Sequence, residues 1–144
     1  MKKVYLASDH GGYALKDQLV SILEKKGYEI KDLGPFNGEE SVSYAEYGKK
    51  LANEVVSDKE AMGIGICGTG LGISYAINRV KGARGARVVS KEDAHLAKEH
   101  NNANILVFGG RQISADQAIE MFDEFEKTEF EGGRHISRIN ELDK

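Results

Sequence analysis

The sequence predicts a single α/β domain: a Rossmann-like three-layer sandwich with a mostly parallel five-stranded sheet, helices on both faces and a C-terminal helix. Short apolar runs alternate with helical patterns throughout the chain, and no linker or internal repeat divides residues 1–144. This length suits one domain with a substantial core. Strands separated by helices pair in parallel, because each crossover returns the chain to the same edge of the sheet.

The predicted elements follow one another regularly. Apolar runs predict strands at residues 4–7, 28–30, 62–66, 83–89 and 105–108. Apolar residues at helical spacing and serine caps predict helices over residues 13–26, 44–56, 74–79, 91–100 and 115–125, with a basic helix from residue 134. Parallel sheets bind ligands beyond the carboxyl ends of their strands. Residues that follow the first, third and fifth strands are therefore candidates for chemistry: Asp9, His10, Cys67 and Arg111.

Composition narrows the classes of function. The chain has 40% hydrophobic and 30% charged residues and a net charge of -3, so we expect no nucleic-acid binding through a basic surface. A single cysteine excludes an intramolecular disulfide and favours a reducing compartment. The N-terminal apolar run is too short for a signal peptide, and nothing reaches transmembrane length. We expect a cytoplasmic protein with no membrane partner.

The segment 65–72 carries the strongest chemical signal. It places Cys67 between an apolar strand and the glycine-rich turn Gly68-Thr69-Gly70-Leu71-Gly72. Glycines let the backbone approach a ligand closely and point N–H groups toward it. A lone cysteine is more often a small buried apolar residue. Its place at a strand end beside alternating glycines favours a base or nucleophile next to an anion hole.

Two further segments combine imidazoles with polar partners. Asp9 and His10 follow the first strand, where a carboxylate and an imidazole suit proton transfer or phosphate binding. The alternative is equally favoured: Asp9 caps the following helix and His10 is a solvated surface histidine. His100 and Asn101 lie where a predicted helix ends. They either cap the end of that helix or provide a catalytic acid with an amide donor beside it. His95 reads only as a helix-surface histidine. The four histidines and Asp93 show no close ligand spacing, so we expect no metal.

Arginines supply a candidate anion clamp. Arg134 and Arg138 lie four residues apart on one predicted helix face, and Arg111 follows a glycine pair. The alternative is a solvated basic face on an acidic protein. Guanidinium forks suit phosphate.

Nucleotide-binding motifs do not account for the glycines. Gly63, Gly65 and Gly68 match a dinucleotide fingerprint by letter, but two lie inside the strand and no acidic residue closes the next strand. The triphosphate-binding P-loop pattern is absent from the sequence. A base, an anion hole, an imidazole acid and a cationic clamp without a cofactor fit aldose–ketose isomerisation of a phosphorylated sugar.

Four ordered motifs resemble the type B ribose-5-phosphate isomerases, a family that also contains the two subunits of galactose-6-phosphate isomerase. They lie at residues 7–12, 65–74, 99–106 and 131–135, and the resemblance covers essentially the whole chain. It implies a metal-independent, cofactor-free isomerase that interconverts ribose 5-phosphate and ribulose 5-phosphate. It also implies homodimers or homotetramers with active sites shared between subunits.

The resemblance assigns roles residue by residue. Cys67 would be the general base, and His100 the acid that opens the sugar ring, helped by Asp9 and Thr69. The remaining positions would bind substrate: the enediolate by the amides of Gly68, Gly70, Leu71 and Gly72, the sugar by Asn101, and the phosphate by His10, Arg111, Arg134 and Arg138.

The chain also departs from the family pattern. Ser43 and Ala45 stand where the family usually has Asp and Pro, Tyr75 replaces a small residue, and Arg87 is an additional arginine. Tyr44 and Tyr75 are placed to reshape the sugar end of the pocket. An isomerase of allose or galactose 6-phosphate therefore remains an alternative, as does a non-catalytic sugar-phosphate sensor.

Overall fold

The computed structural model describes residues 2–144. It contains one sheet of five parallel strands in the order β2-β1-β3-β5-β4, which confirms the predicted fold class. The strands are β1 (Lys3–Ser8), β2 (Glu29–Asp32), β3 (Ala61–Cys67), β4 (Gly85–Arg87) and β5 (Ile105–Gly109). No helix within these residues is long and apolar enough to cross a membrane.

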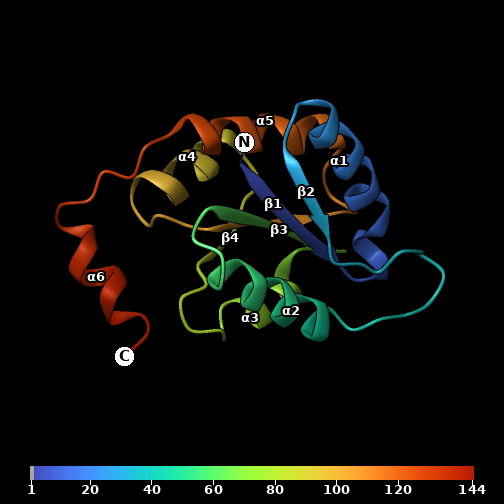
Figure 1. Cartoon of the computed structure of the whole chain (residues 1–144), viewed down its shortest axis with the longest axis horizontal. Helices are drawn as coiled ribbons and strands as arrows, with labels where there is room; N and C mark the ends of the chain where they lie inside the picture. The colour runs from blue at the N-terminus through green and yellow to red at the C-terminus, as the bar shows by residue number, and fades with distance from the viewer. Residues whose placement is uncertain (1) are drawn as a thin grey trace.

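Helices form the two outer layers. α1 (Tyr13–Lys25), α4 (Lys91–Glu99) and α5 (Ala115–Lys127) cover one face, while α2 (Tyr44–Val56) and α3 (Leu71–Ile77) cover the other (Figure 1). α6 (His135–Glu141) lies apart at one end of the molecule. A single 3₁₀ turn, His10–Gly12, joins β1 to α1.

The two faces of the sheet have separate cores because side chains alternate along each strand. On β5, Leu106 and Phe108 pack against α1, α4 and α5, whereas Ile105 and Val107 pack against α2 and α3. All four are fully buried. A strand covered on both faces reads as a continuous apolar run, which is why β5 was predictable from the sequence.

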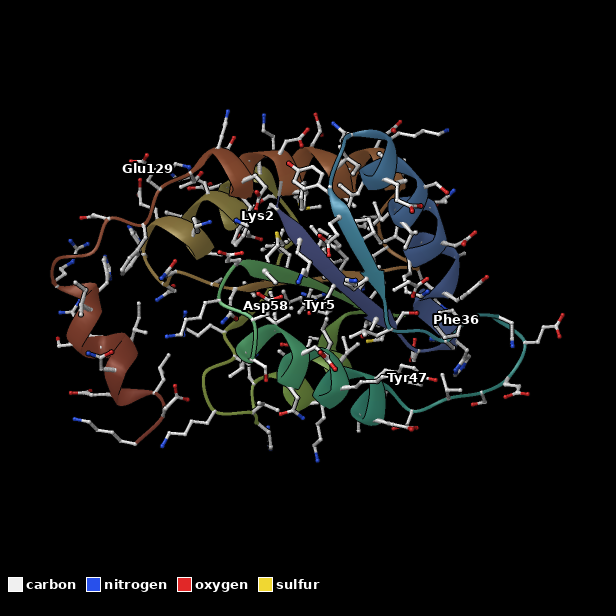
Figure 2. All side chains as sticks on the ribbon, in the orientation of Figure 1. Lys2, Tyr5, Phe36, Tyr47, Asp58 and Glu129 are labelled. Atoms are coloured by element: carbon white, nitrogen blue, oxygen red, sulfur yellow. The ribbon has the colours of Figure 1, made fainter. Side chains whose placement is uncertain are left out.

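Polar side chains fix two loops that the cores do not hold. Asp58, after α2, accepts hydrogen bonds from Lys3 Nζ (2.9 Å) and Tyr5 Oη (3.2 Å) of β1 (Figure 2). Lys16 is fully buried and donates to Asp32 Oδ1 (2.7 Å), which also accepts from the amide of Gly34 (2.9 Å). The second pair anchors the long loop 33–43 beside the carboxyl edge of the sheet.

Three predicted boundaries differ from the structure for local reasons. The strand predicted over residues 83–89 is only Gly85–Arg87, an edge strand with one neighbour. The helix predicted over 74–79 is Leu71–Ile77, and no side-chain cap marks its start. The helix predicted from Arg134 is His135–Glu141, and Arg134 is its N-cap.

Candidate active site

Three loops meet at the carboxyl edge of the sheet and hold one another in place. The amide of Asp9 donates to Ile66 O (3.1 Å), that of Gly110 to Cys67 O (2.8 Å) and that of Arg111 to Gly68 O (3.1 Å). These loops follow β1, β3 and β5. The connections from β1 and β3 leave in opposite directions, which is the switch point where α/β sheets bind ligands.

Cys67 ends β3 at the centre of this edge. Its side chain is buried with 4% exposure, and its Sγ accepts a hydrogen bond from the amide of Gly70 (3.2 Å). Gly70 has φ of 81°, and a Cβ there would lie 3.2 Å from Phe108 O. Both the left-handed backbone and the lack of space require glycine, so the sequence fixes the turn that brings an N–H group to the sulfur.

Thr69 and Leu71 of the glycine-rich turn are exposed. Thr69 Oγ1 accepts from the amide of Leu71 (3.2 Å). The Tyr44 ring packs over Gly72, where a Cβ would lie 2.7 Å from a ring carbon. On its other side Arg87 donates from Nε to Thr69 O (2.9 Å). The turn is therefore flanked by an aromatic ring and a guanidinium group, and neither contact was predicted from sequence.

Arg111 extends across two glycines of the neighbouring loops. A Cβ on Gly68 would lie 3.1 Å from its Nη1, and a Cβ on Gly11 would lie 3.3 Å from its Nη2. Asp9 is 7% exposed, and its Oδ1 accepts from the amide of Gly12 (3.0 Å). The carboxylate therefore caps the 3₁₀ turn, the structural role that its position suggested. His10 is exposed, and its Nδ1 accepts from the amide of Val42 (3.4 Å).

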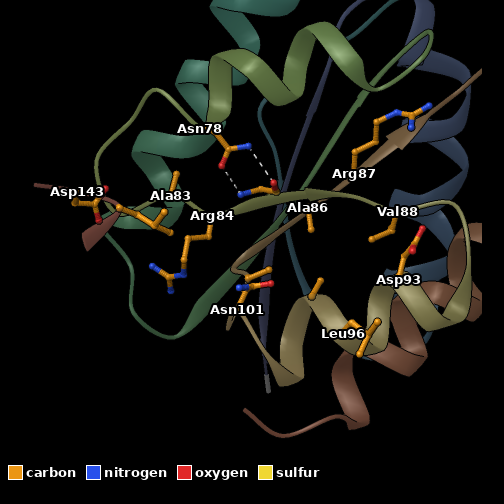
Figure 3. Close-up of a pocket in the computed structure, with 14 residues that line it drawn as sticks. Asn78, Ala83, Arg84, Ala86, Arg87, Val88, Asp93, Leu96, Asn101 and Asp143 are labelled. Carbon is orange, nitrogen blue, oxygen red and sulfur yellow. Dashed lines mark hydrogen bonds between the residues drawn. The ribbon is translucent and has the colours of Figure 1, made fainter. Parts of the chain in front are cut away.

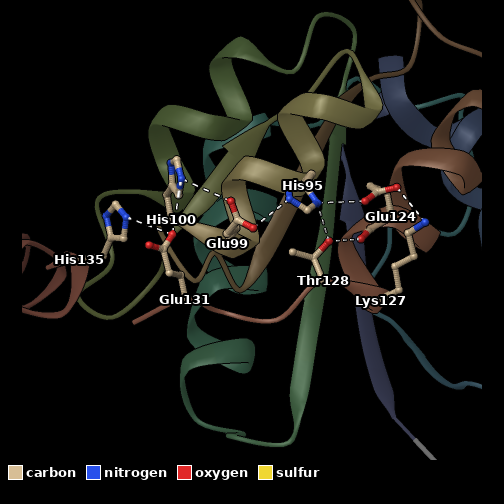
Figure 4. Close-up of polar contacts among 8 residues, drawn as sticks. All are labelled: His95, Glu99, His100, Glu124, Lys127, Thr128, Glu131 and His135. Carbon is tan, nitrogen blue, oxygen red and sulfur yellow. Dashed lines mark hydrogen bonds and ion pairs between the residues drawn. The ribbon is translucent and has the colours of Figure 1, made fainter. Parts of the chain in front are cut away.

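A second group of predicted site residues lies elsewhere. His100 is the C-cap of α4, and its ring stacks on His135 with centroids 4.7 Å apart and planes at 18°. Asn101 follows it and is exposed. Arg134 Nη1 pairs with Glu131 Oε1 (3.1 Å), and Arg138 is exposed on α6. Figure 4 shows His100, Glu131 and His135 facing one another.

The two groups lie at opposite ends of the strands: the Cys67 group at their carboxyl ends and the His100 group at their amino ends. Cys67 is aligned with Gly109, the last residue of β5, whereas His100 and Asn101 precede Ile105, its first residue. Five residues of strand extend over about 16 Å. One small substrate cannot touch both groups of the same chain. We call these two groups of predicted site residues the Cys67 half-site (residues 9–12, 67–72 and 111) and the His100 half-site (residues 100, 101, 134 and 138).

A cavity of about 580 Å³ opens beside the His100 half-site, between β4, α4 and the residues after α6 (Figure 3). Its lining includes Asn101 and the half-buried Arg84, whose Nε donates to Asn102 O (3.0 Å). Burial lowers the pKa of Arg84, although guanidinium groups remain charged at neutral pH. Cys67 is not among the residues that line this cavity, so its volume does not mark the Cys67 half-site.

Carboxylates surround the histidines of α4. His95 Nδ1 lies 3.1 Å from Glu124, and its Nε2 lies 3.1 Å from Glu99, whose other oxygen is 3.5 Å from His100 Nε2 (Figure 4). The hydrogen bond with Glu124 raises the pKa of His95. His95 is thus part of a network, more than the helix-surface histidine expected from sequence. In contrast, burial lowers the pKa of His135.

The expectation that the chain binds no metal rested on the spacing of histidines along the sequence. His100, Glu131 and His135 offer ligand atoms that all lie within 4.8 Å of one another. That expectation was based on residues close in sequence. His100, Glu131 and His135 are close in space because the segment after α5 packs against the end of α4. The amide of Glu131 donates to Glu99 O (2.9 Å), and this bond joins the two segments.

Comparison with known proteins places the whole chain in one group. The family model for Ribose/Galactose Isomerase matches residues 4–142. A probable ribose-5-phosphate isomerase B of Mycoplasma pneumoniae is 37% identical over 139 residues, covering 96% of this chain and 91% of that protein.

Solved structures agree. The crystal structure of a ribose 5-phosphate isomerase from Thermotoga maritima matches with a TM-score of 0.94 and 45% identity, over 99% of this chain and 97% of that chain. Ribose-5-phosphate isomerase B of Mycoplasma genitalium, with bound ribulose-5-phosphate, matches with a TM-score of 0.92 and 38% identity. That match covers 97% of this chain and 93% of the other.

Proposed function

Because this chain belongs to the ribose/galactose isomerase family and is an aldose–ketose isomerase, we propose that it interconverts ribose 5-phosphate and ribulose 5-phosphate through an enediolate. Cys67 is the general base in this reaction, and no metal ion takes part. The observation that carries the proposal is the placement of Cys67 Sγ at the switch point, beside the glycine-rich turn. The relative from Mycoplasma genitalium with bound ribulose-5-phosphate supports the choice of substrate.

The proposed proton transfer needs a base beside the carbonyl carbons. In the open-chain aldose, Cys67 as thiolate takes the proton from carbon 2, and the electron pair forms the double bond to carbon 1. The carbonyl oxygen at carbon 1 thereby becomes an oxyanion. The hydroxyl proton at carbon 2 passes to that oxygen, and the thiol returns its own proton to carbon 1. A positioned base of this kind contributes roughly 10²–10⁴-fold to the rate.

The developing oxyanion requires N–H donors that are already in place. The turn from Gly68 to Gly72 carries backbone amides, of which that of Gly70 lies 3.2 Å from the sulfur, and we assign the oxyanion to these amides. Loss of one preorganised donor typically costs about 2.7–4 kcal/mol of transition-state stabilisation. The Gly70 amide, which binds Sγ, is also placed to hold the base itself.

Ring opening and substrate positioning fall to the remaining residues. We assign His100 as the acid that protonates the ring oxygen, with Asp9 and Thr69 assisting, and Asn101 as a sugar contact. The phosphate is assigned to the exposed basic side chains of both half-sites: His10, Arg111, Arg134 and Arg138. Such contacts position the reacting carbons without entering the chemistry.

The separation of the half-sites supports an oligomer with shared sites. Cys67 and His100 lie at opposite ends of the strands of one sheet, so the Cys67 half-site of one copy must meet the His100 half-site of another. A two-fold axis would create two equivalent complete sites at once. We therefore propose a homodimer, or a homotetramer built from such dimers.

Isomerase assays on ribose 5-phosphate in the presence of EDTA test this function. We expect turnover by the wild type, and a loss of roughly 10²–10⁴-fold in kcat for Cys67→Ala with substrate binding retained. Thermal unfolding of both proteins controls for a folding defect. Normal turnover by Cys67→Ala would refute the base assignment, and an inactive, folded wild type would refute the substrate.

A further inference from the structure

Three side chains that could each coordinate a metal ion face one another at the His100 half-site: His100 and its neighbours Glu131 and His135. Glu131 Oε2 lies 3.8 Å from His100 Nε2 and 3.9 Å from His135 Nε2 (Figure 4). The second oxygen of the same carboxylate, Oε1, is held by Arg134 Nη1 at 3.1 Å. The ion pair with Arg134 therefore leaves Oε2 directed between two imidazoles.

The buried imidazole lacks a partner. The His135 side chain is 10% exposed, and its Nε2 has no hydrogen-bond partner among residues 2–144. Buried polar atoms are nearly always satisfied, because leaving one unpaired costs about 1–3 kcal/mol. Nε2 instead faces a carboxylate oxygen across a gap too long for a hydrogen bond. An atom bound between them would satisfy both.

Two imidazoles and one carboxylate form a donor set that zinc uses where a coordination position stays open. Tetrahedral zinc at its usual bond lengths separates its ligand atoms by about 3.3 Å, so each imidazole must approach the Glu131 oxygen by about half an ångström. Glu131 and His100 have side chains 44% and 35% exposed, which leaves them room to move. The stacked rings must also tilt so that both nitrogens point at the ion.

We propose that His100, Glu131 and His135 form a binding site for a divalent transition-metal ion of the zinc class, and that this ion inhibits the enzyme. The inhibition rests on the proposed function, since the ion would occupy the Nε2 atom of the imidazole assigned as ring-opening acid. The binding itself does not rest on that function. The ion is a regulator or inhibitor here and has no part in the isomerisation.

Calorimetric titration of metal-free oligomer with zinc chloride tests the site without any activity readout. We expect binding by the wild type, and affinity at least about tenfold lower in Glu131→Gln and in His135→Gln. Glu131 is exposed, so Glu131→Gln tests the site even if His135→Gln disturbs the docking of α6. The control His95→Gln removes an imidazole that contacts Glu99 and Glu124 but is outside the cluster, and should bind zinc as the wild type does.

Two results would overturn the site. One is zinc affinity unchanged in both Glu131→Gln and His135→Gln. The other is loss of binding in Cys67→Ser alone, with a thiolate-to-metal charge-transfer band when cobalt replaces zinc, because this would place the ion on the sulfur. An isomerase assay on the same samples distinguishes failure of the metal site from failure of the proposed function. An inactive, folded wild type would count against the proposed function, while the calorimetry still shows whether zinc binds to these residues.

Discussion

The amide of Gly70 donates a hydrogen bond to Cys67 Sγ across 3.2 Å, and it does so from a left-handed backbone conformation with φ of 81°. The glycine-rich turn therefore holds the sulfur and, in our proposal, also receives the oxyanion. Glycine adopts this left-handed conformation without strain, whereas any other residue would be strained there. The arrangement predicts that this glycine matters for turnover as well as for stability.

Gly70→Ala should reduce kcat strongly, and because an added Cβ there meets backbone atoms, it should also destabilise the protein more than Gly27→Ala does. Gly27 has a similar φ of 96°, with nothing within 4 Å of an added Cβ, whereas a Cβ on Gly70 would press on Phe108 O at 3.2 Å. Each substitution should lower the free energy of unfolding by about 1–3 kcal/mol. Denaturant titration and steady-state kinetics on both variants measure the two effects. Equal activity in the two variants would contradict the role given to the turn.

Tyr44 should set the length of sugar that the site accepts. Its ring covers Gly72, and its side chain is half-exposed at the mouth of the turn. We expect kcat/KM of the wild type for ribose 5-phosphate to exceed its kcat/KM for allose or galactose 6-phosphate. In Tyr44→Ala, the ratio of the ribose 5-phosphate value to the hexose phosphate value should be smaller. Tyr75→Ala is the comparison, because Tyr75 was also expected near the sugar, but its side chain is 61% exposed on α3 and we expect a smaller effect.

A wild type that prefers a hexose phosphate would support the alternative substrate class for this chain. An identical ratio in Tyr44→Ala and the wild type would remove Tyr44 from the specificity argument. Both outcomes are read from the same set of substrate titrations.

The His95–Glu124 pair predicts a pH-dependent contribution to stability. Their hydrogen bond raises the pKa of His95 above 6.5 and lowers the pKa of Glu124 below 4.5. The histidine contribution is complete below pH 6.5 and disappears as pH rises through the raised pKa. The glutamate contribution is complete above pH 4.5 and disappears as pH falls through the lowered pKa. Both are present between these values.

His95→Gln should therefore destabilise the protein more near pH 6 than near pH 9. Urea unfolding of the variant and wild type at both pH values measures the difference. Asp17→Asn, at an exposed position of α1, is the matched control and should show no such dependence. A loss of stability that is the same at both pH values would contradict the proposed pairing.

The fold was predictable because its signals are local. The apolar run at Ile105–Gly109 indicates a strand buried on both faces, and Ser114 indicates the start of α5, where it caps the helix in the structure. The segment around Cys67 was predictable for the same reason, since strand, cysteine and glycines are contiguous. The start of α3 was missed because a left-handed glycine, rather than a capping side chain, begins it.

Contacts between distant segments were not predictable from one sequence. His100 and Glu131 lie 31 positions apart, and contacts between distant segments, such as the bond from Glu131 N to Glu99 O, bring them together. The packing of Tyr44 on Gly72 and the bond from Arg87 to Thr69 likewise depend on how helices and loops cross the sheet edge. Composition and periodicity carry no information about these pairings.

Complementation between two inactive variants tests the shared site most directly. Cys67→Ala and His100→Ala are produced with different tags, refolded together, and compared with each variant refolded alone and with a wild-type pair treated alike. If Cys67 of one copy works with His100 of another, mixed pairs contain one intact site, and the mixture recovers about a quarter of wild-type activity. Tagged mixed pairs that are isolated and remain as inactive as the parents would contradict the account.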